Sequence, residues 1–209
     1  MKDFSVAMAL VDCIPVILFC AGAVLLQRDL YNKMSKGAFA LFSAGTINII
    51  MAGALKAVYK LLYAVGVCDF EPLNAMFFPV QSIGFLLAGI GIIAMICFKQ
   101  GNGVVALSAA PLLYKGTFLF VGLMVAGLGL MDAGLAILGK RLKKPLIGVL
   151  FVISFLCSLC MGYLSTKDFT KASMNWIAEG VNVVGQGCFL AGAFALHKAG
   201  LSEYRIPRK

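Results

Sequence analysis

The sequence predicts an all-α protein, a polytopic membrane bundle of six transmembrane helices that forms a single transmembrane domain over residues 1–209. Hydrophobic residues make up 61% of the chain and charged residues only 13%, whereas soluble domains have about 25% charged residues. Apolar runs of about 20 residues, the length that crosses a bilayer as a helix, follow one another along the chain. These runs are too long for the strands of a membrane barrel, so helices are expected.

Polar residues, glycines and prolines separate the apolar runs and set the expected helix ends. Pro15 and Pro79 lie inside the first and third runs, where a proline removes a backbone hydrogen bond and interrupts the helix. Residues 104–114 are apolar, but a helix of ten residues rises only about 15 Å. We expect an interfacial or re-entrant segment there, with a seventh helix as the alternative. The expected helices span residues 4–27, 38–66, 73–98, 116–139, 145–164 and 173–197.

The two halves of the chain carry similar patterns of small and polar residues, which predict a duplicated three-helix unit. An odd number of crossings turns the second copy upside down, so we expect a 3+3 inverted repeat with a binding site where the copies meet. The matched positions are Gly22 with Gly134, Asn74 with Asn175, and Gln81 with Asn182. The segments are the repeats 4–98 and 116–197, the linker 99–115 and the basic C-terminal tail 198–209.

Basic residues give the chain a net charge of +9. In a soluble protein this charge would suggest nucleic acid, but here the Lys and Arg residues lie mostly in loops and tails. Such residues set membrane topology and contact anionic lipid headgroups, so we expect the lipid bilayer as a partner and no nucleic acid. With the N-terminus inside, six crossings leave ten Lys and Arg inside and seven outside, Lys56 being intramembrane. This bias predicts a plasma membrane protein with both termini cytoplasmic.

The last expected helix has a polar face. Asn175, Glu179, Asn182 and Gln186 follow one another at i, i+4, i+7 and i+11, which places them on one side of a helix. A stripe of this length has to contact protein or water. Asn74 and Gln81 repeat the seven-residue spacing in the third expected helix. The two stripes predict a shared polar cavity that binds a substrate or ion. The alternative is that the amides only join neighbouring helices.

Three further ionisable residues, Asp12, Lys56 and Asp132, lie inside expected spans. A charge inside a membrane costs several kcal/mol unless it is paired or hydrated, so such residues are candidates for function. We expect the three to form an intramembrane charge cluster that pairs or carries a proton. Lys60 lies closer to a helix end and is expected to be a lipid-facing anchor, with Tyr59 in the interfacial aromatic belt.

Glycines, 23 in all, cluster within the expected spans. Because they lack a side chain, they let two helices approach closely in lipid, where hydrophobic attraction between helices is absent. We therefore expect these glycines to mark close helix contacts. They are Gly84, Gly89, Gly91, Gly122, Gly127, Gly129, Gly180, Gly185 and Gly187. The alternative is that they are flexible points that permit gating.

No residue pattern predicts an enzyme, a cofactor or a metal site. The sequence has no phosphate-binding loop, Ser-His-Asp set or H-E-x-x-H pair, and its seven cysteines fall mostly in apolar segments, where they pack. The function it favours is a small transporter or channel for a small solute or ion. The alternatives are a non-transporting subunit, sensor or assembly partner, and an intramembrane lipid-modifying enzyme. A homo-oligomer or a partner membrane subunit fits all of these.

Overall fold

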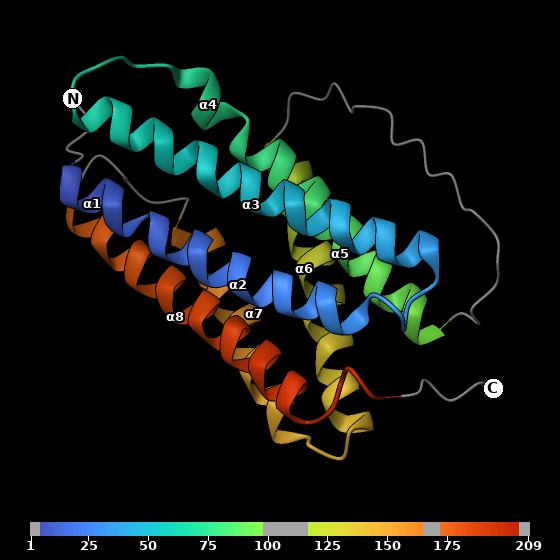
Figure 1. Cartoon of the computed structure of the whole chain (residues 1–209). Helices are drawn as coiled ribbons and strands as arrows, with labels where there is room; N and C mark the ends of the chain where they lie inside the picture. The colour runs from blue at the N-terminus through green and yellow to red at the C-terminus, as the bar shows by residue number, and fades with distance from the viewer. Residues whose placement is uncertain (1–4, 98–116, 165–171, 205–209) are drawn as a thin grey trace.

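The computed structural model describes residues 5–97, 117–164 and 172–204, and this part of the chain is all-α. Six of its spans are long and apolar enough to cross a membrane, which confirms the predicted membrane protein with six transmembrane helices. Each span begins and ends within three residues of its expected position. The helices are α1 (Val6–Val11), α2 (Cys13–Leu30), α3 (Lys36–Ala64), α4 (Glu71–Ala75), α5 (Phe77–Cys97), α6 (Thr117–Arg141), α7 (Leu146–Leu164) and α8 (Ala172–Lys198) (Figure 1).

Two of the spans are broken where the prolines predicted a break. The first span divides into α1 and α2 at Asp12, three residues before Pro15, and the third divides into α4 and α5 at Met76, three residues before Pro79. A proline ring clashes with the carbonyl four residues earlier and donates no backbone hydrogen bond, so the preceding turn is disturbed. One of the two breaks therefore carries an ionisable side chain, Asp12.

The six spans form a closed ring. Around the ring, α2 contacts α3, α3 contacts α5, α5 contacts α6, α6 contacts α7, α7 contacts α8, and α8 returns to α2. Apolar side chains on the outside of the ring remain exposed, among them Ile17, Val24, Leu146 and Leu156. An outer surface of this kind suits hydrocarbon, so the bundle is in contact with the lipid bilayer.

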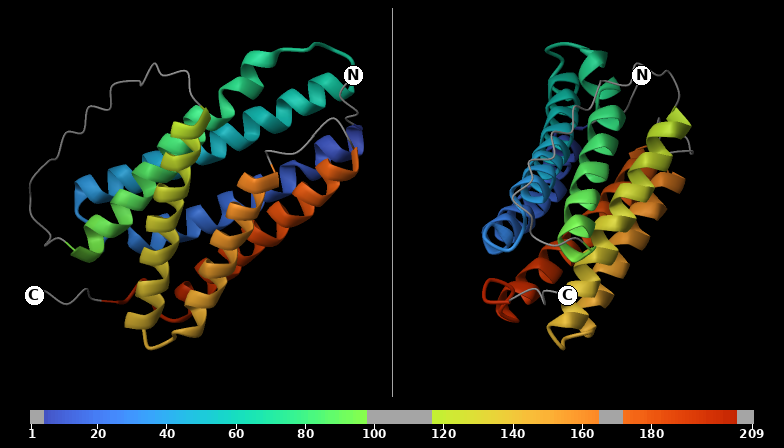
Figure 2. Two further views of the ribbon diagram at one scale, coloured as in Figure 1. Left: turned by 180° about the vertical axis from the view of Figure 1, so that it is seen from behind. Right: turned by 90° about the vertical axis from the view of Figure 1, so that its right-hand side faces the viewer.

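Contacts between the helices fix their directions. We call the end of the bundle where α1 begins the N face, and the end where α8 finishes the C face. Gly127 of α6 faces Leu86 of α5, and Gly134 of α6 faces Ile92. Residue numbers thus rise together in α5 and α6, and Figure 2 shows both helices descending from the upper to the lower side of its left view. Four spans (α1 with α2, α5, α6 and α8) run from the N face to the C face, and α3 and α7 return.

The described residues do not show the predicted inverted repeat. The first span of each three-helix half begins at the same face of the bundle, because α5 and α6 are parallel. Rotation about an axis in the membrane plane would instead exchange the two faces. The matched small and polar residues could not reveal this, because they are common in apolar helices and carry no information on chain direction.

The described residues also do not show the predicted location of both termini on one side. The first described helix, α1, begins at the N face, and the last, α8, ends at the C face. The two ends of the described chain therefore lie at opposite ends of the bundle (Figure 1). The prediction assumed that α5 and α6 form an antiparallel pair. The linker 99–115, with the short apolar segment 104–114, lies outside the described residues.

Some of the glycines mark the closest helix contacts, as expected, whereas Gly122, Gly180 and Gly187 have no described atom within 4 Å of the position that a Cβ would take. A Cβ atom on Gly127 would clash with the backbone of Phe85 and Leu86, and one on Gly89 with the carbonyl oxygen of Gly127. A Cβ on Gly45 of α3 would clash with the backbone of α5. Because backbone atoms meet at both contacts, α5 is held tightly between α3 and α6.

Candidate polar cavity between the six spans

A cavity of about 410 Å³ lies inside the ring and is lined by side chains from all six spans. It occupies the half of the bundle nearer the N face, since its lining includes Asp12 close to the start of the first span and Asn175 close to the start of the last. Its volume is at the lower end of the range of small-molecule sites, about 300–1,000 Å³. The cavity can therefore hold a ligand of metabolite size.

A buried ion-pair cluster joins three spans at the wall of the cavity. The Lys60 Nζ of α3 lies 2.9 Å from Asp12 Oδ2 and 3.0 Å from Glu179 Oε1 of α8. All three residues are less than a tenth exposed. Two carboxylates thus share one ammonium group, and the cluster carries a formal charge of −1. A buried charge is tolerated when it is paired and hydrogen-bonded, so these three residues depend on one another.

Lys56 lies one helical turn before Lys60 and also lines the cavity, but it makes no direct ion pair with any described carboxylate. Its Nζ instead lies 4.0 Å from the centroid of the Phe77 ring, a cation–π contact. Lys56 also keeps partial exposure, whereas Lys60 is 5% exposed. The cavity therefore presents one ammonium group that makes no direct ion pair with a described carboxylate.

Amide side chains complete the polar wall. Asn74, Gln81, Asn182 and Gln186 line the cavity and make no hydrogen bond to another described side chain or backbone group. Asn175 lines it too, and has an interaction of its own. Amide groups that are left without protein partners beside an open space are available to water or to a ligand.

The structure brings most of the predicted site residues together but separates one of them. Asp132 is not in the cavity wall: it lies on α6 at the level of Phe42, 14 residues before Lys56, which corresponds to about 20 Å along the helix axis. Both of its carboxylate oxygens are buried without a hydrogen-bond partner among the described residues. The residues that line the cavity are Asp12, Lys56, Asn74, Gln81, Asn175, Glu179, Asn182 and Gln186.

The predictions for Lys60 and Tyr59 were wrong. Both were expected at the membrane interface, yet Lys60 is 5% and Tyr59 1% exposed, and both line the cavity. The Tyr59 hydroxyl donates a hydrogen bond of 2.9 Å to Asp69. The four-residue spacing of Lys56 and Lys60, which puts both on one helix face, was the signal that could have placed Lys60 beside the cavity.

An aromatic layer closes the cavity toward the C face. Phe19 of α2 stacks on Phe189 of α8 with centroids 4.8 Å apart, and Phe85 of α5 and Phe151 of α7 pack edge-on against this pair. Beyond this layer the interior is filled by side chains that are at most 1% exposed, including Leu26, Ile92, Met131, Leu135 and Leu196. The cavity is thus a dead end that stops about halfway through the bundle.

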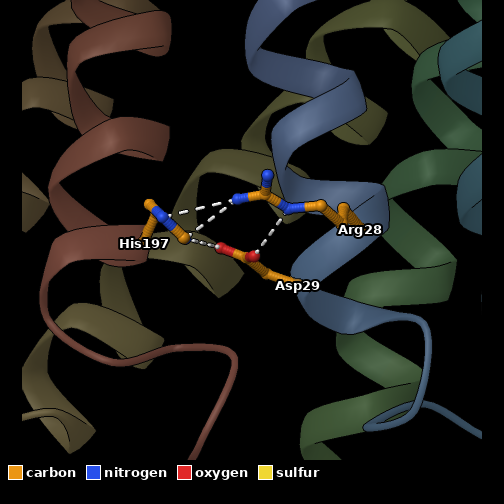
Figure 3. A network of polar contacts seen from close by, with 3 residues as sticks. All are labelled: Arg28, Asp29 and His197. Carbon is orange, nitrogen blue, oxygen red and sulfur yellow. Dashed lines mark hydrogen bonds and ion pairs between the residues drawn. The ribbon is translucent and has the colours of Figure 1, made fainter.

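A second polar network holds α2 and α8 together at the C face (Figure 3). His197 Nδ1 lies 2.9 Å from Asp29 Oδ2, at hydrogen-bonding distance, and Asp29 is only 4% exposed. The Arg28 guanidinium lies 3.3 Å from His197 Nδ1 and 3.5 Å from Asp29 Oδ1. Sequence reasoning missed this network because Asp29 lies at a helix end, where a charged residue needs no special explanation.

Replacing Asp29 with asparagine is expected to lower the free energy of unfolding by about 1.5–3 kcal/mol, the contribution of a hydrogen bond to a charged group. Thermal unfolding in detergent measures the change. Glu203, an exposed acidic residue beyond α8, is the control, and Glu203→Gln should unfold like the parent. Equal unfolding of Asp29→Asn and the parent would mean that the network does not hold the C face together.

Comparison of the chain with protein-family models, with curated proteins and with solved structures gave no match.

Proposed function

We propose that the protein is a membrane carrier that moves a small polar or charged solute through the cavity between its six spans. The observation that carries this proposal is a cavity, lined by every span, whose wall contains four charged side chains inside an apolar bundle. Charged residues inside membrane spans are costly and mark pathways for ions and solutes. A bundle that only needed stability would fill the same space with apolar side chains.

The shape of the cavity favours a carrier over a channel. A channel needs a continuous polar path, whereas here the aromatic layer and the apolar side chains beyond it block the half nearer the C face. A carrier opens its site to one face at a time. In a carrier, the dead-end cavity would correspond to the state that opens toward the N face, because its lining residues lie nearer that face. The same cavity would also suit a non-transporting binding subunit, which transport measurements distinguish from a carrier.

The distribution of basic residues supports a cytoplasmic C face. Of the ten described Lys and Arg residues, two belong to the cavity wall and none of the others flanks the N face. Cytoplasmic loops are enriched in Lys and Arg, so the cavity would open to the outside of the membrane. The residues that flank the C face are Arg28, Lys33, Lys36, Lys140, Arg141, Lys143, Lys144 and Lys198.

Labelling of single cysteines in intact cells tests this orientation. In a variant without the native cysteines, a membrane-impermeant maleimide should label Val67→Cys, which follows α3 at the N face and is 66% exposed. Lys33→Cys and Lys143→Cys should both react only after the cells are opened. Labelling of Lys33→Cys in intact cells, with Lys143→Cys protected, would instead support two termini on the same side.

Flux into liposomes tests the proposed function. The purified protein alone should take up at least one class of solute from a labelled mixture of amino acids, carboxylates, amines and sugars. Glu179→Gln, which keeps the size of the side chain and removes its charge, should reduce this uptake at least about tenfold. Asp132→Asn is the matched control, because Asp132 is an equally buried carboxylate outside the cavity. Folded protein that moves no solute would rule out a carrier acting alone.

A further inference from the structure

The positive and negative charges of the cavity wall are equal in number but are unevenly distributed between two different parts of the wall. Two lysines and two carboxylates line the cavity, so their formal charges sum to zero. The Asp12–Lys60–Glu179 cluster contributes −1, because one ammonium group pairs with both carboxylates. Lys56 contributes +1 and has no direct carboxylate partner among the described residues. The cavity wall thus has a positive part, Lys56, and a negative part, the Asp12–Lys60–Glu179 cluster.

A ligand that matches this wall needs a group for each part. An anion alone would satisfy Lys56 and leave the cavity with a charge of −1, and a cation alone would leave it at +1. In a medium of low dielectric constant, a net charge of either sign is expensive. A zwitterion satisfies both parts and keeps the total at zero.

Unpaired polar atoms around the cavity fit the two groups of a zwitterion. Glu179 Oε2 is buried without a hydrogen-bond partner among the described residues, so the cluster keeps one acceptor that the protein does not satisfy. The side-chain amides of Asn182 and Gln186 follow Glu179 along α8 and make no hydrogen bond with described residues. A ligand carboxylate at Lys56 would gain a charge-assisted bond, which is stronger than a bond between neutral groups.

The deep end of the cavity is apolar. Phe19, Phe85, Met124 and Leu128 line it where the aromatic layer begins, and Phe77 and Phe78 add two rings nearer the lysines. Small-molecule sites combine such apolar walls with a few polar groups that fix the orientation of the ligand. The polar end of the ligand would lie among the charged residues and its apolar part against the phenylalanines.

We propose that the ligand is a small zwitterion with a carboxylate, a protonated amine and an apolar side chain, the chemistry of an apolar α-amino acid. The carboxylate pairs with Lys56, and the ammonium group binds Glu179 Oε2 at the Asp12–Lys60–Glu179 cluster. The side chain packs against Phe19 and Phe85. This substrate class rests on the proposed function, because it assigns the cavity as the site of the carried solute.

Three probes of one shape separate the two polar contacts. Phenylalanine carries both groups, 3-phenylpropanoate lacks the amine, and phenylalaninamide has an uncharged amide in place of the carboxylate. Calorimetric titration of the purified protein in detergent, at a pH that keeps the amine protonated, should give the tightest binding with phenylalanine. Each of the other two should bind at least about tenfold more weakly, because each leaves one charged group of the wall without its partner.

Substitutions of Lys56 and Glu179 test each contact separately. For each variant, its affinities for two probes are compared as a ratio, so a partly unfolded sample does not change the conclusion. Lys56→Gln should make phenylalanine and phenylalaninamide bind equally, and Lys56→Arg should keep the preference for phenylalanine. Glu179→Gln should remove the preference for phenylalanine over 3-phenylpropanoate. Asp132→Asn, outside the cavity, should keep both preferences.

Each other outcome contradicts the proposal. Equal binding of 3-phenylpropanoate and phenylalanine by the parent would identify a site for anions, and equal binding of phenylalaninamide a site for cations. Binding of none of the three probes would exclude this substrate class. In that case, uptake of a sugar or an amine in the liposome assay would still support a carrier. The proposed substrate class can therefore fail while the proposed function holds.

Discussion

Replacing Lys60 with methionine is expected to lower the free energy of unfolding by about 3–5 kcal/mol, the cost of removing one partner from a buried ion pair. Lys60 Nζ lies within 3.0 Å of an oxygen of both Asp12 and Glu179, and no other described cation is within ion-pairing distance of either carboxylate. Methionine has a similar length but no charge. The variant would leave two carboxylates facing each other in an apolar bundle. Thermal or denaturant unfolding in detergent measures the loss.

A neutral version of the same cluster is the control. In the triple variant Asp12→Asn, Lys60→Met and Glu179→Gln, no unpaired charge remains, so most of the stability should return. Lys56→Met should cost less than Lys60→Met, because Lys56 has no direct carboxylate partner among the described residues. If Lys60→Met unfolds like the parent, the ion-pair cluster does not hold the first span, α3 and α8 together.

Replacing Gly127 with leucine is expected to destabilise the bundle by about 3 kcal/mol or more, at the upper end of the cost of overpacking. A Cβ atom at this position would clash with the backbone of Phe85 and Leu86, and a backbone cannot turn away as a flexible side chain can. Helices α5 and α6 would have to separate. The melting temperature in detergent and the yield of folded protein after extraction measure the effect.

Gly180 provides a matched control for that substitution. It lies within α8, is exposed, and has no atom within 4 Å of the position that a Cβ would take. Gly180→Leu adds the same side chain and should leave stability unchanged or raise it by up to about 1 kcal/mol, because leucine is the better helix former. Equal losses from the two substitutions would show that close approach of α5 and α6 is not what makes Gly127 necessary.

Helix positions follow from the sequence because hydrocarbon demands long apolar segments with internally satisfied backbones. Pro15 and Pro79 predict the breaks before α2 and α5 for a similarly local reason, because a proline disturbs the helical turn that precedes it. The polar stripe of α8 could be recognised by its helical spacing, and the structure turns Glu179, Asn182 and Gln186 into the same cavity as Gln81. The local composition and the helical spacing of polar residues are enough to predict these features.

Relations between distant segments did not follow from the sequence. An apolar helix carries no sequence signal of its direction, so the parallel packing of α5 and α6 could not be predicted. For the same reason Asp132 was expected in a cluster with Asp12 and Lys56, although it does not line the cavity. Lys60 was placed in lipid because it lies only one turn from the end of α3. A long flexible side chain so near an interface can reach water or turn inward, and the choice depends on Asp12 and Glu179, which lie 48 and 119 residues away in the chain.

The side of the membrane from which the deep end of the cavity is reached tests the carrier most directly. Gln186 lines the cavity one turn before Phe189 of the aromatic layer. In a variant without the native cysteines, a membrane-impermeant maleimide should label Gln186→Cys from the N face in the absence of solute. During solute exchange it should also react from the C face, because a carrier has to open there to release its cargo.

Three other results would each contradict the carrier. Labelling from both faces without solute would identify a channel. Labelling from the N face only, whether or not solute is exchanged, would identify a non-transporting binding subunit. Protection from both faces would mean that Gln186 faces packed protein or lipid and that the cavity is not a solute site. The expected result is labelling from the N face at rest and from both faces only during exchange.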